Sequence, residues 1–426
     1  GHYQAILSGE GVMKVLFKTI KAAAGERGLA RVFITGVSPV VMSDLTSGYN
    51  VAKNIYLQAR FNALCGFREA EIAEIVARIA RECDLSQAQA DEALAMMRTF
   101  YNGYRFSRRS EEHVYNPTLV LYFLKAFQRD CQYPDRMLDS NLAMDRGKMH
   151  YISRLSEGPR LIFNALSETE PVAIFELADR FGVEDMRYAP KGANFVASLL
   201  YYFGILTHGG MTPFGQLSLR IPNLVIRKLY AESIQEMLLP EGKDSDAARL
   251  AAETLYQHGD IEPLCEFIEQ KYFKVFSNRD YAHSNELTIK TAFLTLLFND
   301  NLYIMESEAE IERGHTDLTM IVRPDMRQYQ VLDILIEFKF VSLKEAGLDG
   351  KTLREMDTQM LQALPTVQEK QREAEEGLAR YRARLKAKFG DTLCLRSFGV
   401  VAVGFERLVT LSDRTEEEHV SASRQD

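Results

Sequence analysis

Residues 331–340, with the sequence VLDILIEFKF, constrain the fold more than any other part of this chain. Side chains point alternately to the two faces of a strand, so residues two apart share one face. One face is then wholly apolar, while the other mixes apolar residues with Asp333, Glu337 and Lys339. The pattern predicts a strand that carries Glu337 and Lys339 side by side at its end, where a functional site would lie.

The preceding apolar segment, residues 318–322, predicts a second strand that pairs with the first. A slip of one residue would turn the two apolar faces to opposite sides, so their coincidence sets the register. A turn centred on Arg327 gives the pairs Leu318 with Ile336, Met320 with Ile334, and Val322 with Leu332. The same register places Asp317 opposite Glu337, with Cβ atoms roughly 5 Å apart.

Two carboxylates at that separation repel each other unless a cation or a proton lies between them. A hard divalent ion such as Mg²⁺, or Mn²⁺ in its place, binds carboxylate oxygens, a backbone carbonyl and water. The candidate ligands are Asp317, Glu337 and the carbonyl of Phe338. Such an ion lowers the pKa of water and screens a scissile phosphate, while Lys339 would orient the water or stabilise the transition state. The alternative is the polar rim of an ordinary hairpin.

Glu286 is a fourth candidate catalytic residue. It lies in the first turn of a predicted helix that Ser284 would cap, on one stripe with Ile289, Phe293 and Leu297. An acid on this core-facing stripe could point at the metal site. An acid in a first turn is also favoured by the helix dipole alone, so both interpretations stay open.

In order, Glu286, Asp317 and the Glu337-Phe338-Lys339 strand resemble the PD-(D/E)XK, or restriction-endonuclease-like, nuclease superfamily. The resemblance implies a magnesium-dependent nuclease, with DNA as the expected substrate, and an α/β fold in which helices flank a mixed sheet. Two departures stand out. His315 follows Gly314 where the family pattern often has arginine, and Gly377 stands on the next helix where a glutamine is common.

Three further segments resemble bacterial AAA-ATPase-like proteins that carry such a nuclease domain at the C-terminus. They are VFITGVSPVVMSDLTSGYN, YNGYRF at 101–106 and VYNP at 114–117. In that family the phosphate-binding loop lies upstream of the segment where this chain begins, so we expect an N-terminally truncated ATPase-like region and ATP binding only in a complete homologue. Thr35 and Ser38 would be a remnant of nucleotide sensing or merely structural. GLDGKT at 347–352 lacks the first glycine of a P-loop.

The chain divides on this basis into four parts. Residues 1–135 would be the end of the ATPase-like domain with its helical lid, including a buried strand at 32–34 and a helical hairpin at 66–106. Residues 136–245 would be a winged-helix-like module, with helical patterns at 160–168, 172–182 and 194–206 before two strands. Residues 246–412 would be the nuclease-like domain, with a long charged helix at 352–389. Residues 413–426 would be a polar tail.

Charge limits how this chain can contact nucleic acid. With 426 residues and a net charge of −8, it does not resemble a protein that coats nucleic acid non-specifically. Contact would need a local patch, and Arg380, Arg384 and Lys388 share one helical stripe, although a solvated surface is the alternative. The last helix of the winged-helix-like module has no lysine or arginine, which favours packing, a protein partner or a second copy of the chain over DNA.

The remaining features set broad limits. The five cysteines are scattered without a CxxC pair, which predicts small buried residues rather than a disulfide framework or a zinc site. No apolar run reaches the length of a membrane span and no targeting segment is recognised, so we expect a cytoplasmic protein. The alternative function is a non-catalytic nuclease-like module that regulates or partners an ATP-driven switch.

Overall fold

The computed structural model describes residues 12–25, 28–35, 55, 57–138, 143–166, 172–178, 191–239, 241–274, 286–306, 310–311, 314–315 and 317–412. The chain forms two compact units. Unit 1 comprises Gly1–Cys131, Asp139–Ala165 and Thr169–Ile226, and unit 2 comprises Gln132–Leu138, Leu166–Glu168 and Arg227–Asp426. The main boundary, at residues 226 and 227, falls within helix α11 (Leu224–Leu238).

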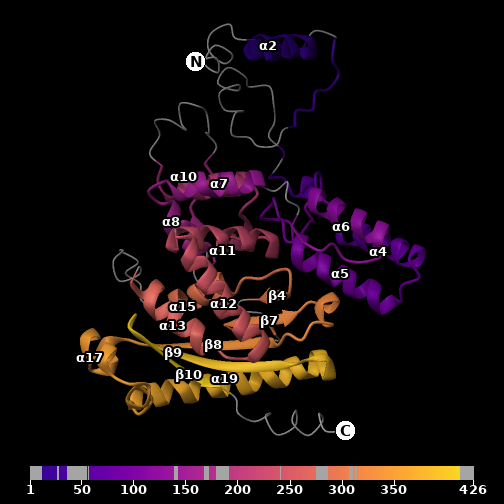
Figure 1. Ribbon diagram of the computed structural model, residues 1–426. Coiled ribbons are helices and arrows are strands. Elements are labelled where there is room, and N and C mark those ends of the chain that lie inside the picture. The colour runs from indigo at the N-terminus through magenta and orange to yellow at the C-terminus, as the bar shows by residue number, and fades with distance from the viewer. Residues whose placement is uncertain are drawn as a thin grey trace. The chain divides into compact units, whose positions relative to one another are not determined.

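Unit 2 is built on a mixed five-stranded sheet in the order β10-β9-β8-β7-β4 (Figure 1). The strands are β4 (Tyr303–Glu306), β7 (Leu318–Val322), β8 (Asp333–Val341), β9 (Leu395–Val403) and β10 (Arg407–Ser412). Strands β8 and β9 are parallel and the other neighbours are antiparallel. A mixed sheet with flanking helices confirms the α/β class and is consistent with the restriction-endonuclease-like fold.

Helices cover both faces of this sheet. The long helix α19 (Pro365–Phe389) packs along β8 and β9 on one face, and α12, α13 and α15 lie on the other (Figure 1). The bounds of the latter are Gly242–His258, Glu262–Phe267 and Glu286–Leu297. Smaller elements of unit 2 are the π-helix Ile268–Tyr272, strands β5 (Glu310–Ile311) and β6 (Gly314–His315), helices α16 (Leu343–Ala346), α17 (Gly350–Glu355) and α18 (Thr358–Gln362), and the 3-10 turns Pro324–Met326 and Gly390–Thr392.

Strand β8 is buried on both sides because its two faces meet different helices. Phe338, on the wholly apolar face, packs against Phe293 of α15 with ring centroids 4.9 Å apart. Leu335, on the other face, clusters with Leu378 and Tyr381 of α19. A parallel β8–β9 pair requires a crossover connection, and α19 supplies it. The crossover therefore lays one helix over the face that carries Glu337 and Lys339.

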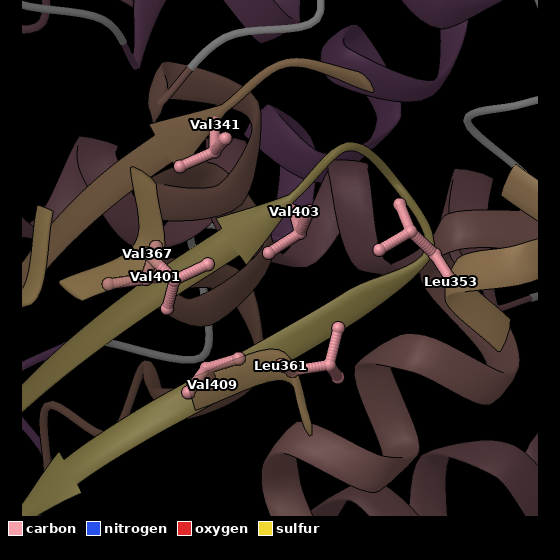
Figure 2. Close-up of a cluster of buried hydrophobic side chains, with 7 residues drawn as sticks. All are labelled: Val341, Leu353, Leu361, Val367, Val401, Val403 and Val409. Carbon is pink, nitrogen blue, oxygen red and sulfur yellow. The ribbon is translucent and has the colours of Figure 1, made fainter. Parts of the chain in front are cut away.

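A second apolar cluster closes the far end of the sheet (Figure 2). Valines of β8, β9, β10 and α19 surround two leucines from α17 and α18, and all seven side chains are at most 2 % exposed. They are Val341, Leu353, Leu361, Val367, Val401, Val403 and Val409. Burying an aliphatic side chain of this size contributes about 1.5–3 kcal/mol to folding. The cluster anchors the N-terminal end of α19 beside the end of β8.

The predicted register of β7 and β8 is confirmed where the ladder extends. Leu318 pairs with Ile336 and Met320 with Ile334, and Arg327 follows the 3-10 turn at the centre of the connection. The predicted pair of Val322 with Leu332 is replaced by a side-chain contact, because the Val322 N–H donates to the Asp333 carboxylate at 2.8 Å.

Asp333 closes this hairpin from inside the core. It has no exposed surface, and its carboxylate accepts from the backbone N–H groups of Val322 and Cys394, each at 2.8 Å. The same carboxylate accepts from Arg327 at 2.5 Å. A buried carboxylate is tolerated when donors satisfy it in this way. Asp333 thus ties β7, the turn and the start of β9 to one point.

Unit 1 contains a helical cluster and a small sheet. The described helices are α2 (Val12–Gly25), α4 (Glu69–Glu82), α5 (Gln87–Tyr101), α6 (Pro117–Asp130), α7 (Ala143–Ser153), α8 (Gly158–Ala165) and α10 (Ala193–Tyr202), with a 3-10 turn at Ala59–Phe61. Strands β1 (Val172–Ile174), β2 (Thr207–Met211) and β3 (Leu217–Arg220) form an antiparallel sheet in the order β1-β3-β2. The predicted helical hairpin at 66–106 is present as α4 and α5, and Ser86 caps α5.

Three sequence predictions of local structure are wrong. Residues 32–34 form no strand, and Val32, Phe33 and Ile34 are 43 %, 64 % and 39 % exposed, because no described strand pairs with them. Residues 172–174, predicted as helix, form β1, since pairing with β3 outweighs the local pattern. The long helix at 352–389 is divided into α17, α18 and α19, because Asp357 caps α18 and Pro365 opens α19.

The cysteine prediction is also wrong for four of the five residues. Cys83 and Cys131 form a disulfide between the C-terminal ends of α4 and α6, whose packing brings residues 48 apart in sequence together. Cys65 and Cys394 are exposed, and Cys265 is buried as expected. Spacing in sequence carries no information about a pair that tertiary contact creates.

Within the described residues, no helix has both the length and the apolar character that crossing a membrane requires.

Replacing Asp333 with alanine should destabilise unit 2. Two buried backbone donors would lose their acceptor, and we expect the free energy of unfolding to fall by about 2–4 kcal/mol. Urea-induced unfolding measures the loss. Asp391→Ala, at an exposed aspartate near the same end of the sheet, is the matched control. Equal midpoints for the two variants would show that the Asp333 contacts contribute little.

Candidate active site

The predicted site residues meet at the end of the β7–β8 ladder. The ladder stops at the pair Leu318 and Ile336, and Asp317 lies immediately before β7. Beyond this pair, the Asp317 carboxylate accepts a hydrogen bond from the backbone N–H of Phe338 in β8, at 2.7 Å. A side-chain oxygen thus continues the hydrogen bonding where the backbone pairing ends. This bond holds the Asp317 carboxylate beside the Glu337-Phe338-Lys339 segment.

Lys339 bridges two of the proposed metal-binding groups. Its ammonium donates to Glu337 Oε1 at 3.0 Å and to the Phe338 carbonyl at 2.9 Å. Glu337 is only 8 % exposed, so this ion pair is largely removed from water. The positive charge of this ammonium offsets part of the negative charge of the carboxylates.

The charges of the four predicted catalytic residues influence one another. Burial and then the charge of Asp317 raise the pKa of Glu337 to about 7, against the opposing effect of Lys339. Burial and Asp317 likewise raise the pKa of Glu286. Burial lowers the pKa of Lys339, but Glu337, Glu286 and Asp317 outweigh it, and the net pKa lies above its ordinary value. Glu286, Asp317, Glu337 and Lys339 therefore share one electrostatic environment.

One oxygen of this cluster has no hydrogen-bond partner. Glu337 Oε2 is buried and accepts no hydrogen bond from the described residues. An unpaired, buried carboxylate oxygen is costly, and a cation or a proton removes the cost. The chemistry of the donor set, two carboxylates and the Phe338 carbonyl, fits a hard divalent ion. No group of three or more His, Cys, Asp or Glu side chains converges on a metal position among the described residues, so water would complete any coordination here.

Glu286 reaches this environment from the helix that covers the other face of β8. It occupies the first turn of α15 and is half-buried, and Phe293 of the same helix packs on Phe338. Lys339, Lys290 and Lys370 oppose the rise in its pKa. The first-turn position suits the helix dipole as well, so the location is compatible with both interpretations made from sequence.

A steric requirement, which the sequence alone did not reveal, explains why residue 377 is a glycine. A Cβ atom added at this position of α19 would lie 2.9 Å from Glu337 Oε1 and 3.1 Å from its Cδ. Any side chain there would displace the Glu337 carboxylate. The glycine noted above as a departure from the family pattern thus makes room for the buried acid.

Two other residues of α19 near the site escaped sequence analysis. Gln371 has a buried Nε2 without a hydrogen-bond partner in the described structure. It lies one turn before Ala374, which packs on Gly399 beside Glu337. Lys370 acts electrostatically on Glu286. Neither residue lies in a strand motif, and only the packing of the helix on the sheet brings them to the site.

The predicted basic stripe of α19 begins close to the site. Arg380 follows Gly377 by three residues, which is about 4.5 Å along a helix axis. Arg380 and Lys388 are exposed and Arg384 is half-buried. The pKa of Tyr381 is raised by burial and then by Glu337, with opposing effects from Arg380 and Arg384. The charges of both the acidic cluster and the arginines therefore act on Tyr381.

Of the two predicted nucleotide-sensing residues, one falls within the described part of the chain. Thr35 is exposed in the segment 28–35, and Ser38 lies outside the described residues.

Comparison with known proteins finds a similarity in this part of the chain. Residues 284–400 match the family model of the PD-(D/E)XK nuclease superfamily, a range that contains Glu286, Asp317, Glu337 and Lys339. An uncharacterized protein in the vnfD 5′ region of Azotobacter chroococcum mcd 1 is 24 % identical over 329 residues, which are 74 % of this chain and 54 % of the relative. The chain thus spans about half the length of that relative. No solved structure matches.

The raised pKa of Glu337 predicts how stability depends on pH. The folded-state pKa of about 7 exceeds the ordinary value of 4.5, so the folded protein binds this proton more tightly than the unfolded chain. The contribution to stability is full below about pH 4.5 and is lost as pH rises through 7. Glu337→Gln should therefore stabilise the protein by roughly 2–3 kcal/mol at pH 8 and have little effect at pH 4.5.

Urea-induced unfolding in EDTA at several pH values tests this expectation. Glu376→Gln, at an exposed position of α19, is the control and should change stability equally at all pH values. A Glu337→Gln effect that is the same at pH 4.5 and pH 8 would contradict the assigned pKa.

Proposed function

We propose that this protein hydrolyses phosphodiester bonds of nucleic acid with a divalent metal ion at the Asp317, Glu337 and Lys339 cluster. The observation that carries the proposal is the buried Glu337 carboxylate, whose Oε2 has no hydrogen-bond partner among the described residues and whose pKa is raised by burial and by Asp317. A buried acid pair of this kind is expensive for a structural role alone. Perturbed acids beside a lysine are typical of catalytic sites.

Each residue has a distinct proposed role. Asp317, Glu337 and the Phe338 carbonyl would hold Mg²⁺, or Mn²⁺ in its place, and the ion would neutralise the carboxylates and lower the pKa of water. The Lys339 ammonium, now 3.0 Å from Glu337 Oε1 and 2.9 Å from the Phe338 carbonyl, would orient the attacking water or stabilise the charge that develops on the phosphate. Glu286 would tune the charge of the cluster from α15.

DNA is the proposed substrate, on the resemblance to PD-(D/E)XK nucleases. The stripe of Arg380, Arg384 and Lys388 on α19 would contact backbone phosphates on one side of the cluster. Such a local stripe is needed because the whole chain carries a net charge of −8. Contacts to phosphate position the strand without reading its sequence.

The alternative is a non-catalytic nuclease-like module. Gly377 favours it, since a glutamine that would help to position phosphate is absent from this place on α19. The cleavage assay below separates the two functions, because a module without activity would leave DNA intact in every metal.

Unit 1 has a separate proposed function. The order helix, strand, helix and hairpin, with the sheet order β1-β3-β2, supports a winged-helix-like module. Its helix α10 is buried on every side, from Phe195 to Tyr201, so it would pack within the unit rather than enter a DNA groove. Such a module would contact a protein partner or a second copy of the chain. The ATPase-like assignment of the preceding region rests on its sequence motifs alone.

Cleavage should depend on the acid and the lysine of the cluster. Purified protein would be incubated with supercoiled DNA, linear DNA and RNA in Mg²⁺, Mn²⁺ or EDTA. We expect cleavage of DNA only with metal, and a loss of at least about a hundredfold in Asp317→Ala and Lys339→Ala. Lys344→Ala, at an exposed lysine just beyond β8, should cleave normally. Undiminished cleavage by both site variants would place the activity elsewhere.

Removing the basic stripe should weaken substrate binding rather than the chemical step. The double variant Arg380→Ala, Lys388→Ala removes two exposed charges, and we expect KM for DNA to rise several-fold and its salt dependence to become shallower. The rate at saturating DNA should stay close to that of the parent protein. The double variant Arg78→Ala, Arg249→Ala, at exposed arginines of α4 and α12, is the charge-matched control, and an equal effect there would assign the change to net charge.

A further inference from the structure

A loop of unit 1 docks on the hairpin β2–β3 through backbone contacts. The Arg105 N–H donates to Thr207 Oγ1 at 2.8 Å, and the same hydroxyl donates to the Arg105 carbonyl at 3.0 Å. The His208 N–H also donates to this carbonyl, at 3.4 Å. These bonds fix Arg105 at the start of β2, where its guanidinium donates to the Ser110 carbonyl at 3.4 Å.

Polar atoms of this docking region lack partners. His208 is 4 % exposed, and its Nδ1 is buried without a hydrogen-bond partner in the described part of the chain. Arg105 Nε is likewise buried and without a hydrogen bond. Burial, then Arg105 and Arg108, lower the pKa of His208 to about 4. The imidazole is therefore neutral at physiological pH and lies in a positive field.

A second histidine–arginine pair, His113 and Arg220, adds to the positive field of this region. His113 Nε2 lies 2.9 Å from Arg220 Nη2, and since arginine only donates, the imidazole nitrogen accepts. Burial, then Arg220 and Arg105, lower the pKa of His113. Both histidines thus respond to arginines and to no carboxylate.

Among the described residues, no carboxylate forms an ion pair with Arg105 or Arg108. The carboxylate of Glu112 lies 3.5 Å from Arg68 instead. Positive charge beside buried polar atoms that lack hydrogen bonds is expected where an anion binds.

Two glycines of the hairpin lie beside the half-buried Arg105 side chain. Gly209 and Gly210 follow His208 at a bulge, and Gly210 has a φ of +126°. A Cβ atom built on Gly210 would lie 3.9 Å from Arg105 Nη2. Because Gly210 has no side chain, a ligand can approach the guanidinium more closely from this position.

We propose that Arg105, His208 and Arg220, with Arg108 at the rim, form a second site that binds a phosphate group of a nucleic-acid strand. A phosphate oxygen would accept hydrogen bonds from the Arg105 guanidinium and from His208 Nδ1–H. Phe214, 89 % exposed at the tip of the same hairpin, offers a ring on which a base could stack. This feature favours a polynucleotide over free phosphate. The site lies in unit 1, outside the matched nuclease domain, and depends on the proposed function only for the choice of nucleic acid.

Binding without cleavage tests this second site. A fluorescein-labelled oligothymidylate of about 20 nucleotides, longer than a typical single-strand site, would be titrated with the full chain in EDTA. Fluorescence anisotropy reports binding at low and at raised salt. We expect Arg105→Gln to weaken binding about tenfold and to reduce the salt slope by about one. Arg108→Gln, at an exposed rim position, should weaken it by about threefold.

The controls separate this site from the nuclease cluster. Arg78→Gln removes the same charge from an exposed position of α4 and should bind within twofold of the parent. The titration in EDTA reports binding without cleavage, so a failure of the nuclease proposal would leave this result readable. Should Arg105→Gln fail to fold by circular dichroism, Arg108→Gln decides. Parent-like binding by the folded arginine variants overturns the site, and competition by inorganic phosphate as effective as that by unlabelled oligonucleotide overturns the polynucleotide assignment.

Discussion

The burial of β8 on both faces is the constraint on which the rest of unit 2 depends. A central strand needs a hydrogen-bonding neighbour on each side and a hydrophobic layer above and below. Here β7 and β9 provide the neighbours, and α15 and α19 provide the layers. Because β9 runs parallel to β8, the chain must cross over between them, and the crossover brings α19 across the face that bears Glu337. The same packing that stabilises the sheet therefore encloses the acid cluster.

This enclosure sets the electrostatics of the cluster. Glu337 loses its hydration when α19 covers it, and the nearby Asp317 adds repulsion. The Lys339 ammonium offsets part of the free-energy cost of burying this charge. Gly377 avoids the clash that a Cβ atom there would make with the Glu337 carboxylate. The contrast with Asp333 on the same strand is informative. Asp333 is more deeply buried, yet three donors satisfy its carboxylate, whereas Glu337 retains an oxygen without a partner. Hydrogen bonding, rather than burial, thus separates an acid that holds the hairpin together from one suited to bind a cation.

Unit 1 shows how an acidic protein can present local positive charge. Its two arginine–histidine neighbourhoods draw residues from the 105–113 loop and from the β2–β3 hairpin, which are far apart in sequence. Burial and the nearby arginines lower the pKa of both His113 and His208. The two imidazoles are therefore neutral at physiological pH and add no further positive charge beside the arginines. The arrangement depends on backbone docking of the loop on β2, and no run of basic residues marks it in the sequence.

The sequence by itself determined the α/β class, the strand β8 and its register with β7, because alternation and matching of apolar faces are local properties. The sequence also predicted that Asp317, Glu337 and Lys339 lie close together. Other features came from contacts between distant segments, namely the Cys83–Cys131 disulfide and the strand at 172–174. The division of the helix at 352–389 follows from the local signals of Asp357 and Pro365, which the helical pattern alone did not reveal. The role of Gly377, the partnerless oxygen of Glu337 and the Arg105–His208 neighbourhood were likewise decided by tertiary packing. Burial and like-charge proximity exist only once helices and strands have met, so no local pattern can encode them directly.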